Sequence, residues 1–135
     1  MSVELRHLRY FLAVADELHF GRAAERVGVA QPAISQQIQR LEAEVGAELF
    51  RRSRREVRLT PAGEVLRGYA RRGLEEIEDG AERARRAAAG EIGHLRIGFI
   101  ETAATAVVPL AVRRLRAERP EVQLTLRELG VDAQL

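Results

Sequence analysis

Residues 31–45 form a helix-like segment whose side chains could read the edges of DNA bases. The apolar residues Ile34, Ile38 and Leu41 recur at helical spacing, so they should face inward. On the opposite, polar face, glutamine can pair with adenine in the major groove, while serine and arginine can reach bases or phosphates. The same pattern would also suit the solvated face of an ordinary amphipathic helix. The residues expected to lie against DNA are Gln31, Pro32, Ala33, Ser35, Gln36, Gln39 and Arg40.

A short basic segment at residues 50–60 could hold the phosphate backbone. The chain of 135 residues has a net charge of only +2, but this segment holds five arginines and one glutamate. Patterns of period two predict strands at residues 49–51 and 57–59, with residues 53–56 as the tip of a hairpin. Such a cationic hairpin is a wing, which can straddle the DNA backbone or enter a narrow minor groove. The arginines expected to contact DNA are Arg52 and Arg55, followed by Arg54 and Arg51.

The segment before residue 31 has the spacing of a helix-turn-helix. Ala24 is small enough for two helices to cross, and Gly28 supplies the turn four residues later. Ile34 then anchors the second helix after six more residues. An earlier helix is expected from the apolar positions Leu5, Leu8, Leu12 and Ala15, with Phe11 alongside. The prediction for residues 1–60 is therefore a winged helix-turn-helix.

A long helix is predicted to follow. Thr60 and Pro61 have the types of an N-cap and a first helical residue. Small and apolar residues then recur at alternating steps of four and three, which is a heptad pattern. Its two glycines each disfavour a helix by about 1 kcal/mol relative to alanine, and close approach of a second helix would offset this. Residues 61–90 are therefore expected to pair two copies of the chain, although packing against the chain's own winged helix is an alternative that can coexist. The expected contact positions are Leu66, Ala70, Gly73, Ile77, Gly80 and Ala84.

Residues 91–135 have a different pattern. Strands are predicted at residues 95–100 and 122–126, and a helix at residues 105–119 that ends before Pro120. One strand–helix–strand unit cannot cover both faces of a parallel sheet, so we expect these residues to be the first part of a larger α/β domain. The predicted fold is mainly α: a winged helix-turn-helix, a long linker helix, and the beginning of an α/β domain.

Several motifs make the winged helix and linker resemble the LysR-type transcriptional regulators. The motifs are Leu8-Arg9-Tyr10-Phe11, Phe20-Gly21-Arg22-Ala23-Ala24, Val29-Ala30-Gln31-Pro32-Ala33-Ile34-Ser35-Gln36-Gln37-Ile38, Leu41-Glu42, Gly46, Leu49-Phe50 and Leu59-Thr60-Pro61-Ala62-Gly63. The resemblance implies sequence-specific binding of double-stranded promoter DNA by a homodimer or homotetramer. In one departure from the family, Ala30 stands where many relatives have a serine, and alanine cannot cap the helix that follows.

Residues 95–134 resemble the start of that family's effector-binding domain, which is of the periplasmic-binding-protein type. The resemblance is greatest to the branch that senses aromatic-degradation intermediates such as muconate. In that branch, hydroxyl residues at the positions of Thr102 and Val131 help to hold a ligand carboxylate; Thr102 keeps the hydroxyl and Val131 lacks it. The resemblance thus implies a small-molecule inducer, a carboxylate, in a complete effector domain, with Thr102 as an effector-binding residue. A helix cap is the alternative role for Thr102.

Other function classes find no support in the sequence. The chain has no cysteine, and its three histidines (His7, His19 and His94) lack ligand spacing, so no enzyme, metal site or cofactor is expected. The longest uncharged stretch, residues 102–112, falls short of the roughly 18 to 20 residues of a membrane span, so no membrane partner and a cytoplasmic location are expected. The remaining alternative is a protein-interaction module that uses the linker helix and does not read DNA.

Overall fold

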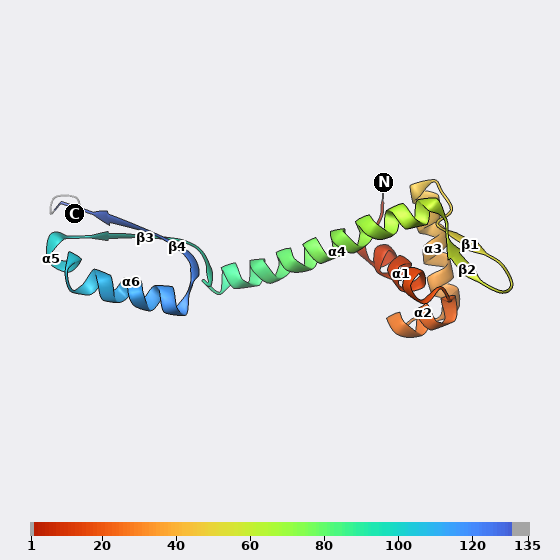
Figure 1. Ribbon diagram of the computed structural model, residues 1–135, viewed down its shortest axis with the longest axis horizontal. Helices are drawn as coiled ribbons and strands as arrows, with labels where there is room; N and C mark the ends of the chain where they lie inside the picture. The colour runs from red at the N-terminus through yellow and green to blue at the C-terminus, as the bar shows by residue number, and fades with distance from the viewer. Residues whose placement is uncertain (1, 131–135) are drawn as a thin grey trace. The chain divides into compact units, whose positions relative to one another are not determined.

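The computed structural model describes residues 2–130 and divides into two compact units, Met1–Glu78 and Asp79–Leu135. The long helix α4 begins in the first unit and continues past Glu78 (Figure 1). The order of elements confirms a winged helix-turn-helix, a long helix and a strand–helix–strand unit. The elements up to the long helix are α1 (Leu5–Glu17), α2 (Phe20–Val27), α3 (Gln31–Val45), β1 (Phe50–Arg52), β2 (Val57–Leu59) and α4 (Pro61–Ala88). The others are β3 (Ile92–Phe99), α5 (Glu101–Ala104), α6 (Val107–Glu118) and β4 (Glu121–Glu128).

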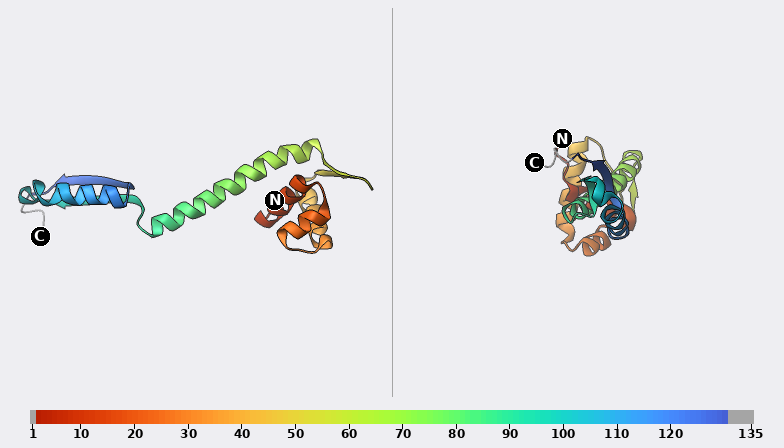
Figure 2. Two further views of the ribbon diagram at one scale, coloured as in Figure 1. Left: turned by 60° about the horizontal axis from the view of Figure 1, so that its bottom comes forward. Right: turned by 90° about the vertical axis from the view of Figure 1, so that its left-hand side faces the viewer.

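The core of the first unit lies where α1, α2 and α3 meet, and Figure 2 shows these helices as one cluster. Ile34, Ile38 and Leu41 of α3 are fully buried, as the helical spacing predicts. On α1 the expected inward face needs correction, because Phe11 and Val14 are fully buried whereas Leu5 is 40% exposed. The apolar residues of α1 cover two adjacent faces, so their spacing alone did not identify the buried one.

The wing is an antiparallel hairpin that projects from the helices (Figures 1 and 2). Phe50 pairs with Leu59 and Arg52 with Val57, and the amide of Ser53 donates to the carbonyl of Glu56 at 2.9 Å to close the tip. The first strand thus begins one residue later than the alternation predicts. The two-strand prediction itself is confirmed.

Thr60 attaches α4 to the segment before the wing. Its hydroxyl donates to the carbonyl oxygen of Glu48 at 2.6 Å and accepts from the amide of Gly63 at 3.0 Å. The second bond is the N-cap that the sequence predicts. Thr60 therefore starts α4 and fixes that start to the end of the loop after α3.

In the second unit β3 and β4 are parallel, paired from Ile92 with Glu121 to Phe99 with Glu128, and joined by α5 and α6. The strand–helix–strand prediction is confirmed, but the short α5 was not expected, since four residues are too few to show a period. Arg86 bonds to Glu121 at 2.9 Å and to Glu91 at 3.2 Å, and these hydrogen bonds raise the pKa of Arg86 above its usual value. None of the described helices is both long and apolar enough to cross a membrane.

Candidate nucleic-acid interface

The turn between α2 and α3 has the geometry that the spacing predicts. Gly28 has a φ of 74° and a ψ of 35°, the left-handed conformation that glycine adopts without strain. Its amide donates to the carbonyls of Ala24 and Glu25, and the amide of Val29 donates to Ala24 at 3.0 Å. Ala24 is 3% exposed, as expected for a small residue at a helix crossing. The turn therefore fixes the orientation of α3 relative to α2.

The outer face of α3 is free for a ligand. Within residues 2–130, none of the side chains on this face makes a hydrogen bond or an ion pair. Ala30 is the N-cap residue and makes no side-chain capping bond, so backbone amides at the start of α3 lack that partner. Ser35 is half-buried, and the other residues expected at the interface, Gln31, Pro32, Ala33, Gln36, Gln39 and Arg40, are exposed.

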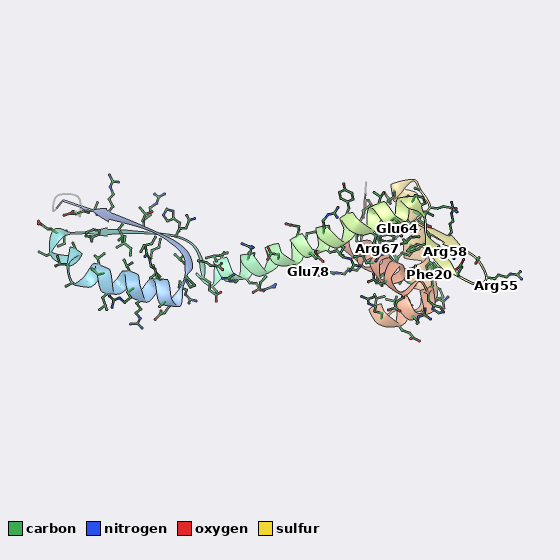
Figure 3. All side chains as sticks on the ribbon, viewed as in Figure 1. Phe20, Arg55, Arg58, Glu64, Arg67 and Glu78 are labelled. Atoms are coloured by element: carbon green, nitrogen blue, oxygen red, sulfur yellow. The ribbon has the colours of Figure 1, made fainter. Side chains whose placement is uncertain are left out.

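The tip of the wing presents two arginines to solvent. Arg54 and Arg55 are exposed and form no ion pair with any described residue, and Figure 3 shows Arg55 at the far end of the hairpin, pointing away from the helices. The amides of Arg55 and Glu56 donate to the hydroxyl oxygen of Ser53, which holds the tip in shape. Arg58, by contrast, pairs with Glu56 at 2.9 Å.

The hairpin arginines and the polar face of α3 lie on the same side of the first unit. One surface hollow is lined by Gln31 at the start of α3 and by Arg54 and Arg55 at the tip. A second hollow is lined by Gln39 together with Arg51 and Arg52. The structure therefore brings together two groups of residues that lie 12 to 24 positions apart in the sequence.

Two polar residues of this region were not found by sequence reasoning. His19 lines the first hollow, and its Nδ1 accepts from the amide of Arg22 at 3.0 Å, so it caps α2. Gln37 is half-buried, and its Oε1 has no partner among the described residues. His19 precedes its helix and Gln37 lies beside the buried face, so helical spacing selects neither.

Arg52 is also expected to contact DNA, but unlike Arg54 and Arg55 it contacts other side chains of the protein. Its guanidinium lies over the ring of Phe20, with 4.6 Å between Cζ and the ring centre. Its Nη2 atom is 3.5 Å from Oε2 of Glu42 on α3. Arg52 is thus bound within the protein, and neither partner could be identified from the charge pattern of the hairpin.

The expected pairing positions of α4 divide into two groups. Ala70 is 2% exposed and Leu66 packs against the core, so both serve the chain's own winged helix. Ile77 is 49% exposed, and Gly80 and Ala84 are exposed, while Gly73 is half-buried. Val65 and Tyr69, at 64% and 68% exposed, are further apolar residues that the heptad pattern missed. Each precedes a core-facing position by one residue, which turns it toward solvent.

Two positions of the second unit are related to effector binding by the family resemblance. Thr102 is exposed within α5, and Val131 lies outside the described residues. Within residues 2–130, no group of three or more histidine or acidic side chains is arranged to hold a metal ion.

The first unit defines a winged helix-turn-helix protein, and comparisons with known proteins identify its family. The model described as "Bacterial regulatory helix-turn-helix protein, lysR family" matches residues 5–64, and that of the "LysR substrate binding domain" matches residues 88–135. The chain belongs to the LysR family.

Individual relatives agree with this assignment. The HTH-type transcriptional regulator AlsR of Bacillus subtilis is 48% identical over 98% of this chain and 44% of AlsR, so the chain spans less than half of that protein. The crystal structure of CbnR, a LysR family transcriptional regulator, is 37% identical with a TM-score of 0.92, over 98% of this chain and 46% of CbnR. The DNA-binding domain of BenM, in complex with catB site 1 DNA, is 43% identical with a TM-score of 0.62, over 64% of this chain and 97% of that domain.

Proposed function

We propose that this chain is the DNA-binding and dimerising part of a LysR-type transcriptional regulator that recognises promoter DNA by sequence. The proposal rests on one observation: the exposed polar face of α3 and the exposed arginines of the wing lie on the same side of the first unit. The DNA complexes of the BenM domain and of CbnR support it, because both proteins share this part of the fold.

In this proposal α3 enters the major groove, which is about 12 Å wide. The uncapped amides at the start of α3 and the guanidinium of Arg40 hold phosphates, which fixes the register of the helix on DNA. Arg54 and Arg55 reach the flanking backbone or minor groove. The side chains that read or orient on base edges are Gln31, Ser35, Gln36 and Gln39, with Pro32 and Ala33 packed beside them.

Two copies pair through the exposed side of α4. The exposed apolar side chains of Tyr69 and Ile77 support this, since a solvated helix gains nothing from them. Gly73, Gly80 and Ala84 would let a second helix approach closely. The resulting homodimer, or a homotetramer of two such pairs, places two recognition helices in successive major grooves about 34 Å apart.

A small-molecule inducer would act through the complete effector domain. The exposed Thr102 lies just after the carboxyl end of β3, the edge at which α/β sheets bind ligands, and a carboxylate is the proposed inducer class. We expect the protein to act by binding rather than by catalysis, without a cofactor, in the cytoplasm where bacterial promoters lie.

Selection of duplexes from a random DNA library by the purified chain tests this function. We expect one sequence to be enriched, with an affinity that falls steeply as salt rises, by about 0.9 in log K per unit of log salt for each phosphate neutralised. A chain that enriches no sequence, and that self-associates equally at low and high salt, would instead be a protein-interaction module.

A further inference from the structure

Arg52 differs from the tip arginines because its guanidinium already contacts other side chains of the protein. The planar group lies 4.6 Å from the centre of the Phe20 ring, which is the geometry of a cation–π contact. One of its nitrogens lies 3.5 Å from Glu42. The Arg52 side chain is 35% exposed, against 71% for Arg58 on the neighbouring strand. Its position is thus set by contacts within the protein.

Glu42 lies between the guanidinium of Arg52 and two backbone amides. The Glu42 side chain is 16% exposed, and its Oε1 accepts from the amides of Leu49 at 2.9 Å and Phe50 at 3.3 Å. A carboxylate that is largely withdrawn from water is stabilised by hydrogen bonds and by a nearby opposite charge. Without Arg52, Glu42 would keep the amides alone, and the connection between α3 and the start of β1 would loosen.

Phe20 connects Arg52 to the core. Its ring is 6.0 Å from that of Phe50 at an angle of 70°, and Phe50 lies 5.4 Å from the ring of Phe11. Phe11 and Phe50 are almost fully buried. Arg52 therefore contacts the last of three neighbouring aromatic rings, which come from α1, β1 and α2. Its ion pair with Glu42 also connects it to α3.

We propose, building on the DNA-binding function above, that Arg52 is a positioning residue for the wing. By joining β1 to Phe20 and Glu42, it sets where Arg54 and Arg55 stand relative to the recognition helix. Its guanidinium acts through those two arginines and is not a phosphate ligand. This replaces the sequence-based expectation that Arg52 contacts DNA directly.

The test measures the affinity of the full chain for the duplex that it enriches from a random library. Enrichment by the unaltered chain decides the proposed function separately, before any variant is compared. Arg52→Met keeps a long side chain over Phe20 and removes the charge, and should lower affinity about tenfold. With Arg54→Gln and Arg55→Gln already present, the wing tip has nothing left to position, so Arg52→Met should change affinity by less than about twofold. A direct phosphate ligand would keep its full effect there and reduce the salt slope by about 0.9.

A second cycle tests the ion pair. In a chain carrying Glu42→Gln, Arg52→Met should again change the affinity by less than about twofold, because the carboxylate that Arg52 neutralises is already absent. Arg51→Met is the matched control: Arg51 is exposed on the same strand, so its effect should be equal in every background. Thermal unfolding shows which variants are folded at the assay temperature. The proposal would be overturned if Arg52→Met left the affinity of the unaltered chain unchanged. It would also be overturned if Arg52→Met lowered affinity equally in the unaltered chain, in the chain with Arg54→Gln and Arg55→Gln, and in the chain with Glu42→Gln.

A conservative variant covers the case in which Arg52→Met does not fold. Arg52→Lys keeps a positive charge for a phosphate but loses the planar surface over Phe20 and the forked donor geometry. A positioning role predicts that Arg52→Lys also loses affinity, about threefold or more, and that this loss disappears when Arg54 and Arg55 are replaced. Full retention of affinity by Arg52→Lys would identify a simple phosphate contact.

Discussion

Single residues of the interface differ in whether they can distinguish one DNA sequence from another. Gln36 is exposed on the polar face of α3, and its amide makes no hydrogen bond within the described residues. It can therefore offer both a donor and an acceptor to one base edge. Arg55 stands at the tip of the wing with a charge that any phosphate would attract. Replacing each of these two side chains should therefore affect DNA binding in a different way.

Gln36→Ala should alter sequence preference. Loss of a two-bond contact to a base should weaken binding to the enriched duplex by about 1 to 3 kcal/mol and leave binding to a scrambled duplex nearly unchanged. Competition titrations with both duplexes measure the difference. Gln123→Ala removes another exposed glutamine, from β4, and should change neither affinity. An equal loss on both duplexes would mean that Gln36 does not read a base.

Arg55→Gln should weaken binding to all sequences alike. If Arg55 neutralises one phosphate, the slope of log K against log salt should become shallower by about 0.9. Titrations at four or more salt concentrations give this slope. Arg114→Gln is a suitable control, since Arg114 is an exposed arginine of α6 and its loss removes the same charge. A slope that stays unchanged for Arg55→Gln would contradict the phosphate contact.

The sequence predicts the side chains of α3 better than those of the wing. Ile34, Ile38 and Leu41 follow a helical period, so their burial and the exposure of Gln36 and Gln39 follow from local spacing. The setting of Arg52 depends on Phe20 and Glu42, which come from two other elements and meet it only after folding. A charge pattern cannot show which arginine of a basic segment is held by the protein itself.

At the scale of elements, α4 approaches the start of the wing through one glycine. A Cβ atom on Gly63 would overlap the carbonyl oxygen of Leu49 and lie 2.8 Å from Leu59 Cδ2. The overlapping oxygen belongs to the backbone of Leu49 rather than to the end of a flexible side chain, so neither α4 nor the segment before β1 can move aside easily. Gly63 therefore lets α4 pack closely on the segment that leads into β1.

Gly63→Ala should destabilise the first unit by about 1 to 3 kcal/mol, the usual range for forcing an extra methyl into a packed site. Denaturant unfolding followed by circular dichroism measures this. Gly68→Ala is the matched control on the same helix, because a Cβ there would meet only the flexible end of Arg72, at 3.3 Å. That change should be neutral, or stabilising by up to about 1 kcal/mol from helix propensity. Equal stabilities of the two variants would contradict the close approach.

The sequence predicts the end of a helix where a glycine can adopt a left-handed conformation, and the start of a helix where a hydroxyl can cap it. Gly28 ends α2 in a left-handed conformation and Thr60 caps α4, both as the sequence indicates, and Gly46 ends α3 in the same way as Gly28. The inward face of α1 was not predictable, since Leu5 and Phe11 belong to adjacent apolar faces and only tertiary packing chooses between them. The same holds for Leu66 and Ala70, which the heptad pattern predicts to pair two copies. In the structure both pack against the core of the chain's own winged helix.

For the molecule as a whole, α4 should decide the oligomeric state. Ile77 is 49% exposed in the long helix, and a charge there would be buried if two copies pair through this side. Ile77→Glu should therefore convert a dimer into a monomer at micromolar concentration, as measured by sedimentation velocity. Glu75→Lys changes a charge two positions away, nearly opposite on the helix at 3.6 residues per turn, and should leave the dimer intact. A monomeric unaltered chain would rule out pairing through α4.

A paired α4 also predicts how the DNA must be arranged. Two recognition helices bound to one face of the duplex require half-sites about 34 Å apart, close to one helical turn. Inserting about 5 base pairs between the half-sites of the enriched duplex turns the second half-site to the far side, so the affinity of the dimer should fall toward that for a single half-site. The Ile77→Glu monomer should bind both duplexes equally, because each winged helix then acts alone. If the unaltered chain also bound both spacings equally, the two winged helices would not be held in register by α4.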